Sequence, residues 1–196
     1  MSGRVGIFGG TFDPPHVGHL VAASQARHQL GLSSVTLMVA NEPWQKLGER
    51  TLTPAAIRLE LVTRAVDGHG GLRAGDAEIR RGGPTFTIDT LEELAVEQPG
   101  VEVVVILGAD AASGLASWHR AEEVAAAATI AVLERPGAPV TAPMPGVRLE
   151  RVAMPSLEIS SSDLRGRCRR GEPVEFLVPD GVWSEMRRLH LYGLEA

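Results

Sequence analysis

The sequence has almost no cysteine and no long apolar run, and each shortage excludes a class of protein. Cys168 is the only cysteine in 196 residues, so an intramolecular disulfide is impossible, and no Cys/His spacing indicates structural zinc. No apolar segment approaches the roughly 20 residues that span a bilayer. Gly9, Gly10 and Asp13 interrupt the first apolar stretch, where a secretory signal would continue. We therefore expect a cytoplasmic protein without a membrane segment.

An excess of positive charge is also missing. The chain carries 19 Lys and Arg against 24 Asp and Glu, for a formal net charge of −5. General nucleic-acid binding needs a basic field, so the composition argues against a nucleic-acid partner. A local positive cluster can still bind a small phosphorylated molecule, because local and total charge are independent.

Short apolar runs predict the buried strands of a parallel sheet. The runs are nearly continuous rather than alternating, which is typical of strands covered on both faces. They comprise Val5–Phe8, Val35–Ala40, Val103–Leu107 and Thr129–Leu133. A further strand is expected near Val147–Val152, after a surface loop.

Helical patterns separate these runs. They cover Gly18–Leu30, Thr53–Val66, Ile88–Glu97 and Asp180–Leu191, and a Pro- and Gly-rich stretch at 136–147 predicts a surface loop. The alternation predicts an α/β fold with a doubly wound, Rossmann-like parallel sheet. We expect a single domain over 1–196, whose last part, from about 155, packs as small helices on the core.

The segment from Gly6 to Leu20, GIFGGTFDPPHVGHL, carries the clearest functional signal. Two glycines follow a predicted strand, where we expect a tight turn that brings a ligand close to the backbone. His16 and His19 then stand three residues apart at the start of a helix, a spacing that places both imidazoles on one side. Helix N-termini favour anions, and open α/β sheets bind ligands at this end of the first strand.

Other nucleotide-binding patterns do not fit this segment. The chain lacks the P-loop pattern G-x-x-x-x-G-K-[ST], and it lacks the dinucleotide pattern G-x-G-x-x-G followed by an acid, because Asn41 stands after the second strand. A second segment, ISSSDLR at Ile159–Arg165, places three serines and an arginine at the start of another helix. Together the two segments predict two helix N-termini directed at phosphates.

These segments resemble the signatures [HT]-x-G-H and I-S-S-T-x-[IV]-R of a nucleotidyltransferase superfamily. Three further stretches resemble bacterial nicotinate mononucleotide adenylyltransferases: NEPWQK, GGPTFTIDTL and LGADAASGLASWHR. Their residues are most similar to those of actinobacterial members. The C-terminal EFLVPDGV is similar too, so the resemblance covers essentially the whole chain. Ser162 and Leu164 depart conservatively from the family's Thr and Ile.

The resemblance implies that ATP and nicotinate mononucleotide react to give nicotinate adenine dinucleotide and pyrophosphate, with Mg²⁺ held mainly by the substrate phosphates. It implies an ATP site made of Gly9, Gly10, Thr11, Phe12, His16, His19, Ser160, Ser161, Ser162 and Arg165. It implies a mononucleotide site made of Asn41, Lys46, Thr85, Gly108, Asp110 and Trp118. The catalytic groups would be His16, His19, Lys46 and Arg165, with no protein ligand for the metal.

The residue types agree with this chemistry. The attacking phosphate is already ionised at neutral pH, so it needs no general base, and none is evident in the motifs. Positioning and charge stabilisation can supply the catalysis. The partners would be the two substrates, and a homo-oligomer is possible.

Three alternatives stay open. The first is an adenylyltransferase acting on phosphopantetheine, a family that usually carries Thr where His16 stands and lacks GGPTFTIDTL and SWHR. The second is an enzyme that uses nicotinamide mononucleotide. The third is a nucleotide-sensing module without turnover, against which the intact set of His16, His19, Lys46 and Arg165 argues.

Overall fold

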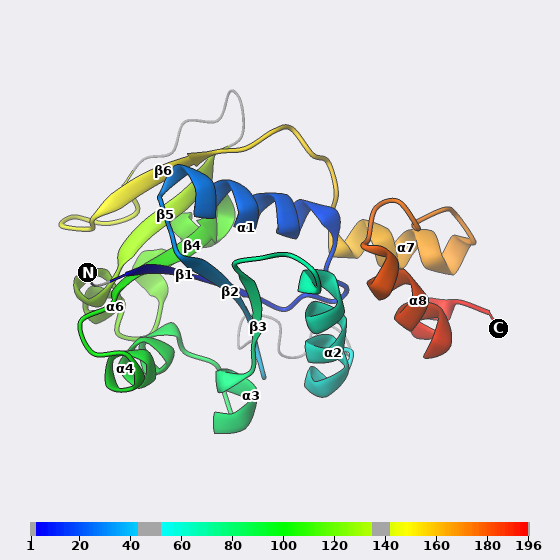
Figure 1. Ribbon diagram of the computed structural model, residues 1–196, viewed down its shortest axis with the longest axis horizontal. Coiled ribbons are helices and arrows are strands. Elements are labelled where there is room, and N and C mark those ends of the chain that lie inside the picture. The colour runs from blue at the N-terminus through cyan, green and yellow to red at the C-terminus, as the bar shows by residue number, and fades with distance from the viewer. Residues whose placement is uncertain (1–2, 43–51, 135–141, 196) are drawn as a thin grey trace.

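The computed structural model describes residues 3–42, 52–134 and 142–195 and has a six-stranded parallel sheet at its centre (Figure 1). The strand order is β3-β2-β1-β4-β5-β6, so the chain builds outward from β1 on one side and then from β4 on the other. This reversal between β1 and β4 is the topological switch point of a doubly wound sheet. The strands are β1 Arg4–Gly10, β2 Ser34–Val39, β3 Leu72–Gly75, β4 Glu102–Gly108, β5 Thr129–Glu134 and β6 Leu149–Ala153.

Helices cover both faces of the sheet. Helices α1 and α2 lie against one face, and α4, α5 and α6 lie against the other (Figure 1). The helices are α1 Val17–Gln29, α2 Ala55–Val66, α3 Ala77–Arg81, α4 Thr87–Glu97, α5 Ala109–Ser113, α6 Ala121–Ala127, α7 Ser161–Arg170 and α8 Asp180–Arg188, with 3₁₀ turns at Leu115–Ser117 and Leu191–Gly193. None of the helices within the described ranges has the length and apolar character to cross a bilayer.

The continuous apolar runs are explained by this double cover. Neighbouring residues of one strand enter different cores: Phe8 faces the cluster under α1, and Ile7 faces the cluster under α4. In β4, Val104 and Val105 divide in the same way. Successive strand side chains point to opposite faces, so both must be apolar when both faces are buried. The predicted fold class is confirmed.

Element boundaries differ from the sequence expectation in a few places. Strand β3 was not predicted, because its four residues include Arg73 and Gly75, and Gly75 alone among them is fully buried. Thr87 is the first residue of α4 rather than its cap, and Pro54 precedes α2 rather than beginning it. Residues 136–141 of the predicted surface loop lie outside the described residues.

The role expected for Gly9 and Gly10 as turn residues is wrong. Both lie inside β1, and the residue with positive φ is Phe12, at 49°. A Cβ at Gly10 would lie 2.7 Å from the Phe12 ring, so this glycine makes room for a buried aromatic side chain. A Cβ at Gly9 would meet nothing within 4 Å. Gly10 is thus required by close packing rather than by backbone conformation, whereas Gly9 leaves open space beside the strand.

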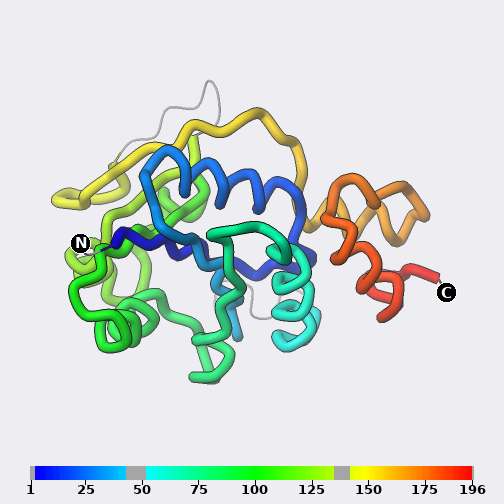
Figure 2. The backbone as a smooth tube through the Cα atoms, viewed as in Figure 1, coloured from blue at the N-terminus to red at the C-terminus, as the bar shows by residue number. Residues whose placement is uncertain are grey.

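The C-terminal helices pack around a third apolar cluster of their own, shared with α2. Its buried members include Leu61 and Ala65 of α2, Leu164 and Cys168 of α7, and Met186 of α8. Figure 2 shows the chain passing from β6 back along α1 before it enters this C-terminal part, and Gln29 of α1 bonds to the backbone of Ala153 at the end of β6. These shared contacts support the proposal that residues 1–196 form a single domain.

One buried cation joins the loops at the carboxyl end of the sheet. Arg58 of α2 is 1% exposed, and its guanidinium donates to the carbonyl oxygens of Thr53, Thr11, Ala40 and Asn41 at 2.8, 2.8, 2.8 and 3.0 Å. Thr11 follows β1, and Ala40 and Asn41 follow β2. The arginine therefore fixes two loops of different strands relative to α2.

We expect Arg58→Met to destabilise the fold by about 3 kcal/mol or more, because it leaves several buried carbonyl groups without donors. For a chain of this size that corresponds to a Tm lower by roughly 10 °C. Arg64→Met on the same helix is the control. Its side chain is half exposed and pairs with Glu60, and its longer contact with the buried Glu185, at 3.5 Å, is shared with Arg188, so we expect a loss of about 1 kcal/mol or less. Equal losses in the two variants, measured by thermal melting, would contradict the role given to Arg58.

Candidate functional site

Two histidines meet at the N-terminus of α1. The imidazoles of His16 and His19 stack with centroids 3.7 Å apart and planes 25° apart, which confirms that the spacing puts them on one side of the helix. The backbone N–H of His16 donates to Nδ1 of His19 at 3.1 Å. A neutral imidazole that accepts at Nδ1 carries its proton on Nε2. His19 thus has a defined tautomer with a donor on its far side.

Burial controls the charge of His16. The residue is 6% exposed, and this burial lowers its pKa to about 4. His16 is therefore neutral at pH 7 and adds no imidazolium charge to the positive end of the helix dipole.

Phe12 supports the histidines from below. The residue is 2% exposed, and its ring packs edge-on against the rings of Phe8 and His19. The distances between ring centroids are 5.9 Å to Phe8 and 5.0 Å to His19. The side chain of Phe12 is thus part of the core. Of this residue, only the backbone remains for the predicted contact with ATP. The sequence pattern could not separate these roles, because Phe12 adjoins the ligand loop in either case.

The start of α7 is tied to the same loop. Ser160 caps the helix by accepting from the N–H of Asp163 at 3.1 Å, Ser161 donates to the Pro14 carbonyl at 2.8 Å, and Arg165 donates to the Asp13 carbonyl at 2.7 Å. Arg165 also reaches the Ser162 hydroxyl at 3.0 Å. The two predicted helix N-termini therefore lie together, although about 145 residues separate them along the chain.

Asp13 of this loop is buried rather than presented to a ligand. It is 1% exposed, and its Oδ1 accepts from the Tyr192 hydroxyl at 2.7 Å. Burial, together with the Asp13 charge, raises the pKa of Tyr192 well above its usual range, so the phenol stays protonated as the donor. This pair joins the first loop to the C-terminal turn and was not foreseen from the sequence.

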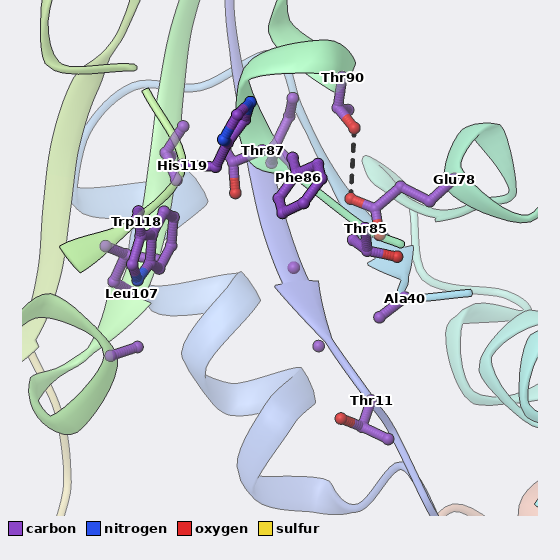
Figure 3. A pocket seen from close by; sticks show the side chains of 15 residues that line it. Thr11, Ala40, Glu78, Thr85, Phe86, Thr87, Thr90, Leu107, Trp118 and His119 are labelled. Carbon is purple, nitrogen blue, oxygen red and sulfur yellow. Dashed lines mark hydrogen bonds between the residues drawn. The ribbon is translucent and has the colours of Figure 1, made fainter. Parts of the chain in front are cut away.

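A pocket of about 280 Å³ opens beside the histidine loop, between the ends of β1 and β4 (Figure 3). This is the switch point at which open α/β sheets bind ligands. Figure 3 shows Trp118 and His119 on one side and Glu78, Thr85 and Thr90 on the other. The lining consists of Ile7, Gly9, Gly10, Thr11, Ala40, Glu78, Thr85, Phe86, Thr87, Thr90, Val105, Leu107, Ala111, Trp118 and His119.

Two loops meet at one edge of this pocket. Asn41 donates from its backbone N–H to the Thr85 hydroxyl at 3.1 Å and from its side chain to the Gly83 carbonyl at 3.0 Å. Gly82 and Gly83 both have positive φ, 71° and 69°, which makes the turn before Thr85 possible. The structure thus brings together Asn41 and Thr85, two residues predicted to contact the mononucleotide.

Aromatic side chains form the opposite wall. His119 packs on Phe86 with centroids 4.4 Å apart, and Trp118 packs partly into the core beneath α4. The Trp118 Nε1 is buried and has no hydrogen-bond partner. A buried indole N–H without an acceptor is uncommon in a folded protein.

Three other predicted site residues lie less centrally. Gly108 ends β4 and caps α5, and Asp110 is exposed on the first turn of α5, both next to the lining residues Leu107 and Ala111. Lys46 lies outside the described residues. Within the part of the chain that the structure describes, no three His, Cys, Asp or Glu side chains gather as a metal site.

The comparisons with known proteins agree with this fold and site. A family model described as cytidylyltransferase-like matches residues 7–167, and the chain belongs to this family. Among its relatives, a probable nicotinate-nucleotide adenylyltransferase of Corynebacterium kroppenstedtii is 40% identical over 96% of this chain and 90% of its own. One of the same name from Exiguobacterium sibiricum is 39% identical over 97% of this chain and 99% of its own.

Solved structures show the same fold. A Plasmodium falciparum nicotinic acid mononucleotide adenylyltransferase complexed with NaAD superposes with a TM-score of 0.79 over 98% of both chains, at 16% identity. A putative nicotinate-nucleotide adenylyltransferase of Vibrio parahaemolyticus gives 0.71 at 20% identity, over 97% of this chain and 95% of that one. At these identities the likeness concerns the fold alone. The family resemblance seen in the sequence motifs is confirmed by the curated relatives.

The low pKa of His16 predicts a specific pH dependence of stability. Between the ordinary histidine pKa of about 6.5 and the folded value of about 4, only the unfolded state binds this proton. The stability that His16 contributes is thus present above pH 6.5 and lost as the pH falls toward 4, by roughly 3 kcal/mol in total.

We expect His16→Gln to remove this part of the loss in unfolding free energy at low pH. Denaturant unfolding of both proteins between pH 7 and pH 4 measures it. The control is His28→Gln at an exposed position of the same helix, which should keep the wild-type slope. A His16→Gln protein with the wild-type slope would show that His16 is not buried in its neutral form.

Proposed function

We propose that this protein transfers the adenylyl group of ATP to nicotinate mononucleotide, giving nicotinate adenine dinucleotide and pyrophosphate in NAD biosynthesis. The observation that carries the proposal is the junction of two unlike surfaces. The stacked histidines and the start of α7 form a phosphate-binding edge, and an aromatic pocket adjoins it at the switch point. The curated relatives, named for this reaction at about 40% identity, support the same assignment.

The phosphate edge provides positioning and charge stabilisation. The nucleophile is the phosphate of the mononucleotide, and the bond that breaks joins the α- and β-phosphates of ATP. Negative charge builds on the leaving pyrophosphate, where N–H donors and a guanidinium stabilise it most. We assign this role to His19, through Nε2–H, and to Arg165, with Gly9, Gly10, Thr11, His16 and Ser160–Ser162 completing the ATP site.

The aromatic pocket is suited to the pyridine ring. We assign the ring to the face of Trp118, with Asn41, Thr85, Gly108 and Asp110 around the mononucleotide. The backbone N–H of Thr85 already donates to the Glu42 carbonyl at 3.3 Å, so this donor holds the turn. The first N–H groups of α4, at Phe86 and Thr87 in the pocket lining, are the donors best placed to favour a ring carboxylate.

A divalent ion, Mg²⁺, is assigned to the substrate phosphates. Phosphate oxygens and water supply the hard oxygen ligands that Mg²⁺ prefers. The carboxylate of Asp13, the one acid of the first loop, is turned to Tyr192 and is not available as a ligand. Held by substrate phosphates, the ion would neutralise negative charge that the histidine loop alone cannot.

Lys46, a cytoplasmic location and a homo-oligomer stay predictions from the sequence, as does the absence of nucleic-acid and membrane partners.

The test is a pyrophosphate-release assay with ATP and Mg²⁺ and, in turn, nicotinate mononucleotide, nicotinamide mononucleotide and phosphopantetheine. We expect turnover with nicotinate mononucleotide, at a kcat/KM at least ~100-fold above that for the amide, because an amide presents its own NH₂ to donors placed for a carboxylate. Higher activity with phosphopantetheine, or none with any acceptor, would contradict the proposal.

His19→Ala should lower kcat/KM by at least ~100-fold, the scale of one lost transition-state donor. The melting temperature should change little, because the ring lies at the edge of the site and is only partly buried. His28→Ala, an exposed histidine of the same helix, should be active as wild type. Near-normal turnover by His19→Ala would remove the residue from the mechanism.

Arg165→Ala should raise the KM for ATP more than the KM for the mononucleotide, because its guanidinium lies with the α7 serines at the loop. Arg165→Lys should recover only part of the loss, since a single ammonium cannot replace the two-pronged contact to Asp13 and Ser162. Arg167→Ala is the control, because this half-exposed residue on the same helix pairs with Asp163 instead. Steady-state kinetics in which the KM values for both substrates rise equally would indicate a general structural effect.

A further inference from the structure

Glu78 is a buried acid in the wall of the pocket, and nothing in the reaction described above uses it. It lies on the short helix α3 and is 6% exposed. Figure 3 shows its side chain on the same wall as Thr85 and Thr90, across the pocket from Trp118 and His119. The sequence pattern did not single it out, because the stretch AEIRR looks like an ordinary charged helix surface.

Its partners are hydroxyl groups rather than cations. The Thr90 hydroxyl donates to Oε1 of Glu78 at 3.2 Å and itself accepts from Arg81 at 2.9 Å. Arg81 forms its ion pairs with Glu93, at 2.9 Å, and with Asp89, at 4.0 Å, both on α4. The nearest guanidinium thus shares its charge with two other acids, and its hydrogen-bonded path to Glu78 runs through Thr90.

The remaining charged neighbours do not balance Glu78 either. Arg80, on the same helix, pairs with Asp76 at 3.4 Å and with Glu93 at 3.1 Å. Asp89 adds negative charge from α4, and His119 faces the pocket from the opposite wall. Burial is the largest influence and raises the pKa of Glu78 to about 7, against the opposing effects of Thr90, Arg81 and Thr85. The carboxyl therefore changes its charge near neutral pH.

We propose that Glu78 makes mononucleotide recognition proton-linked: the pocket accepts a substrate carboxylate when Glu78 is protonated, and the ionised Glu78 opposes it. This inference rests on the proposed function, because it requires a ring that bears a carboxylate.

The reason is repulsion between two carboxylates in one enclosed pocket. A carboxylate that binds beside a buried acid disfavours the ionised form of that acid. Above pH 7 the complex must therefore take a proton from solvent onto Glu78, and that requirement weakens binding as the pH rises. Protonated Glu78 keeps the contact with Thr90, since Oε1 still accepts. Glu78 is thus a specificity-determining residue, because its protonation makes the affinity depend on both the charge of the ring substituent and the pH.

The experiment compares two mononucleotides from pH 6.5 to 8.5 at saturating ATP. For wild type we expect the KM for nicotinate mononucleotide to rise roughly fivefold, as for a pKa shifted by about one unit in the complex. The KM for nicotinamide mononucleotide should follow only the titration of the phosphate that both substrates carry. The ratio of the two KM values removes that shared contribution and isolates the ring carboxylate.

Glu78→Gln should remove the rise, because the amide keeps an acceptor for Thr90 and cannot ionise. Its KM for nicotinate mononucleotide at pH 8.5 should stay near the value at pH 6.5. Glu97→Gln is the matched control: it makes the same change at an exposed acid at the end of α4, outside the pocket lining and outside the charges that act on Glu78, so the rise should persist. Melting curves check that both variants fold.

The outcomes separate the inference from the function on which it rests. A wild-type KM ratio that is flat with pH, or an equal rise in Glu78→Gln, would overturn the role of Glu78 while leaving the transferase activity established. Absence of turnover with nicotinate mononucleotide at every pH would overturn the proposed function and this inference with it. If Glu78→Gln does not fold, the contrast between the two substrates in wild type still decides.

Discussion

The site depends on a guanidinium that no solvent reaches. Arg58 donates to backbone carbonyls of the loops that follow β1 and β2, and these loops carry the phosphate edge and one wall of the pocket. Loops at the end of a parallel sheet lack the regular backbone hydrogen bonds that hold the strands together. A planar group with five donors can bind several carbonyls at once, which no neutral side chain can do. The two halves of the site therefore share one anchor.

The fold was largely predictable because apolar strand segments and helical patterns alternate repeatedly along the chain. Buried strands such as Val103–Leu107 must be apolar on both faces, so four of the six strands stand out as continuous runs, with helical periods between them. What failed were short pieces whose residues carry little pattern. Helix α3 has five residues, and β3 has four. Such segments obtain their structure from neighbours, and a local window of sequence does not contain those neighbours.

The site was predictable where chemistry is local, as in the histidine pair three residues apart and the serines that open α7. It was hidden where contacts join distant segments. Glu78 with Thr90 and Arg58 with Thr11 have no signature, because each residue is ordinary in its own stretch. Asp13 shows the same limit: as a single residue before a proline it suggests a turn, and only the folded chain reveals a buried acceptor. Gly10 was noticed for the wrong reason, since the space it leaves is filled by Phe12 two residues later.

The hydrogen bond between Asp13 and Tyr192 spans 179 residues and has a consequence for the order of folding. A contact between segments far apart in the sequence closes slowly, because a long loop must lose entropy before the contact forms. Strands β1 and β2 are neighbours along the chain and pair directly, so this part of the sheet can form earlier. The first loop therefore reaches its final state only when the C-terminal turn docks, and the sheet can be complete before the loop is.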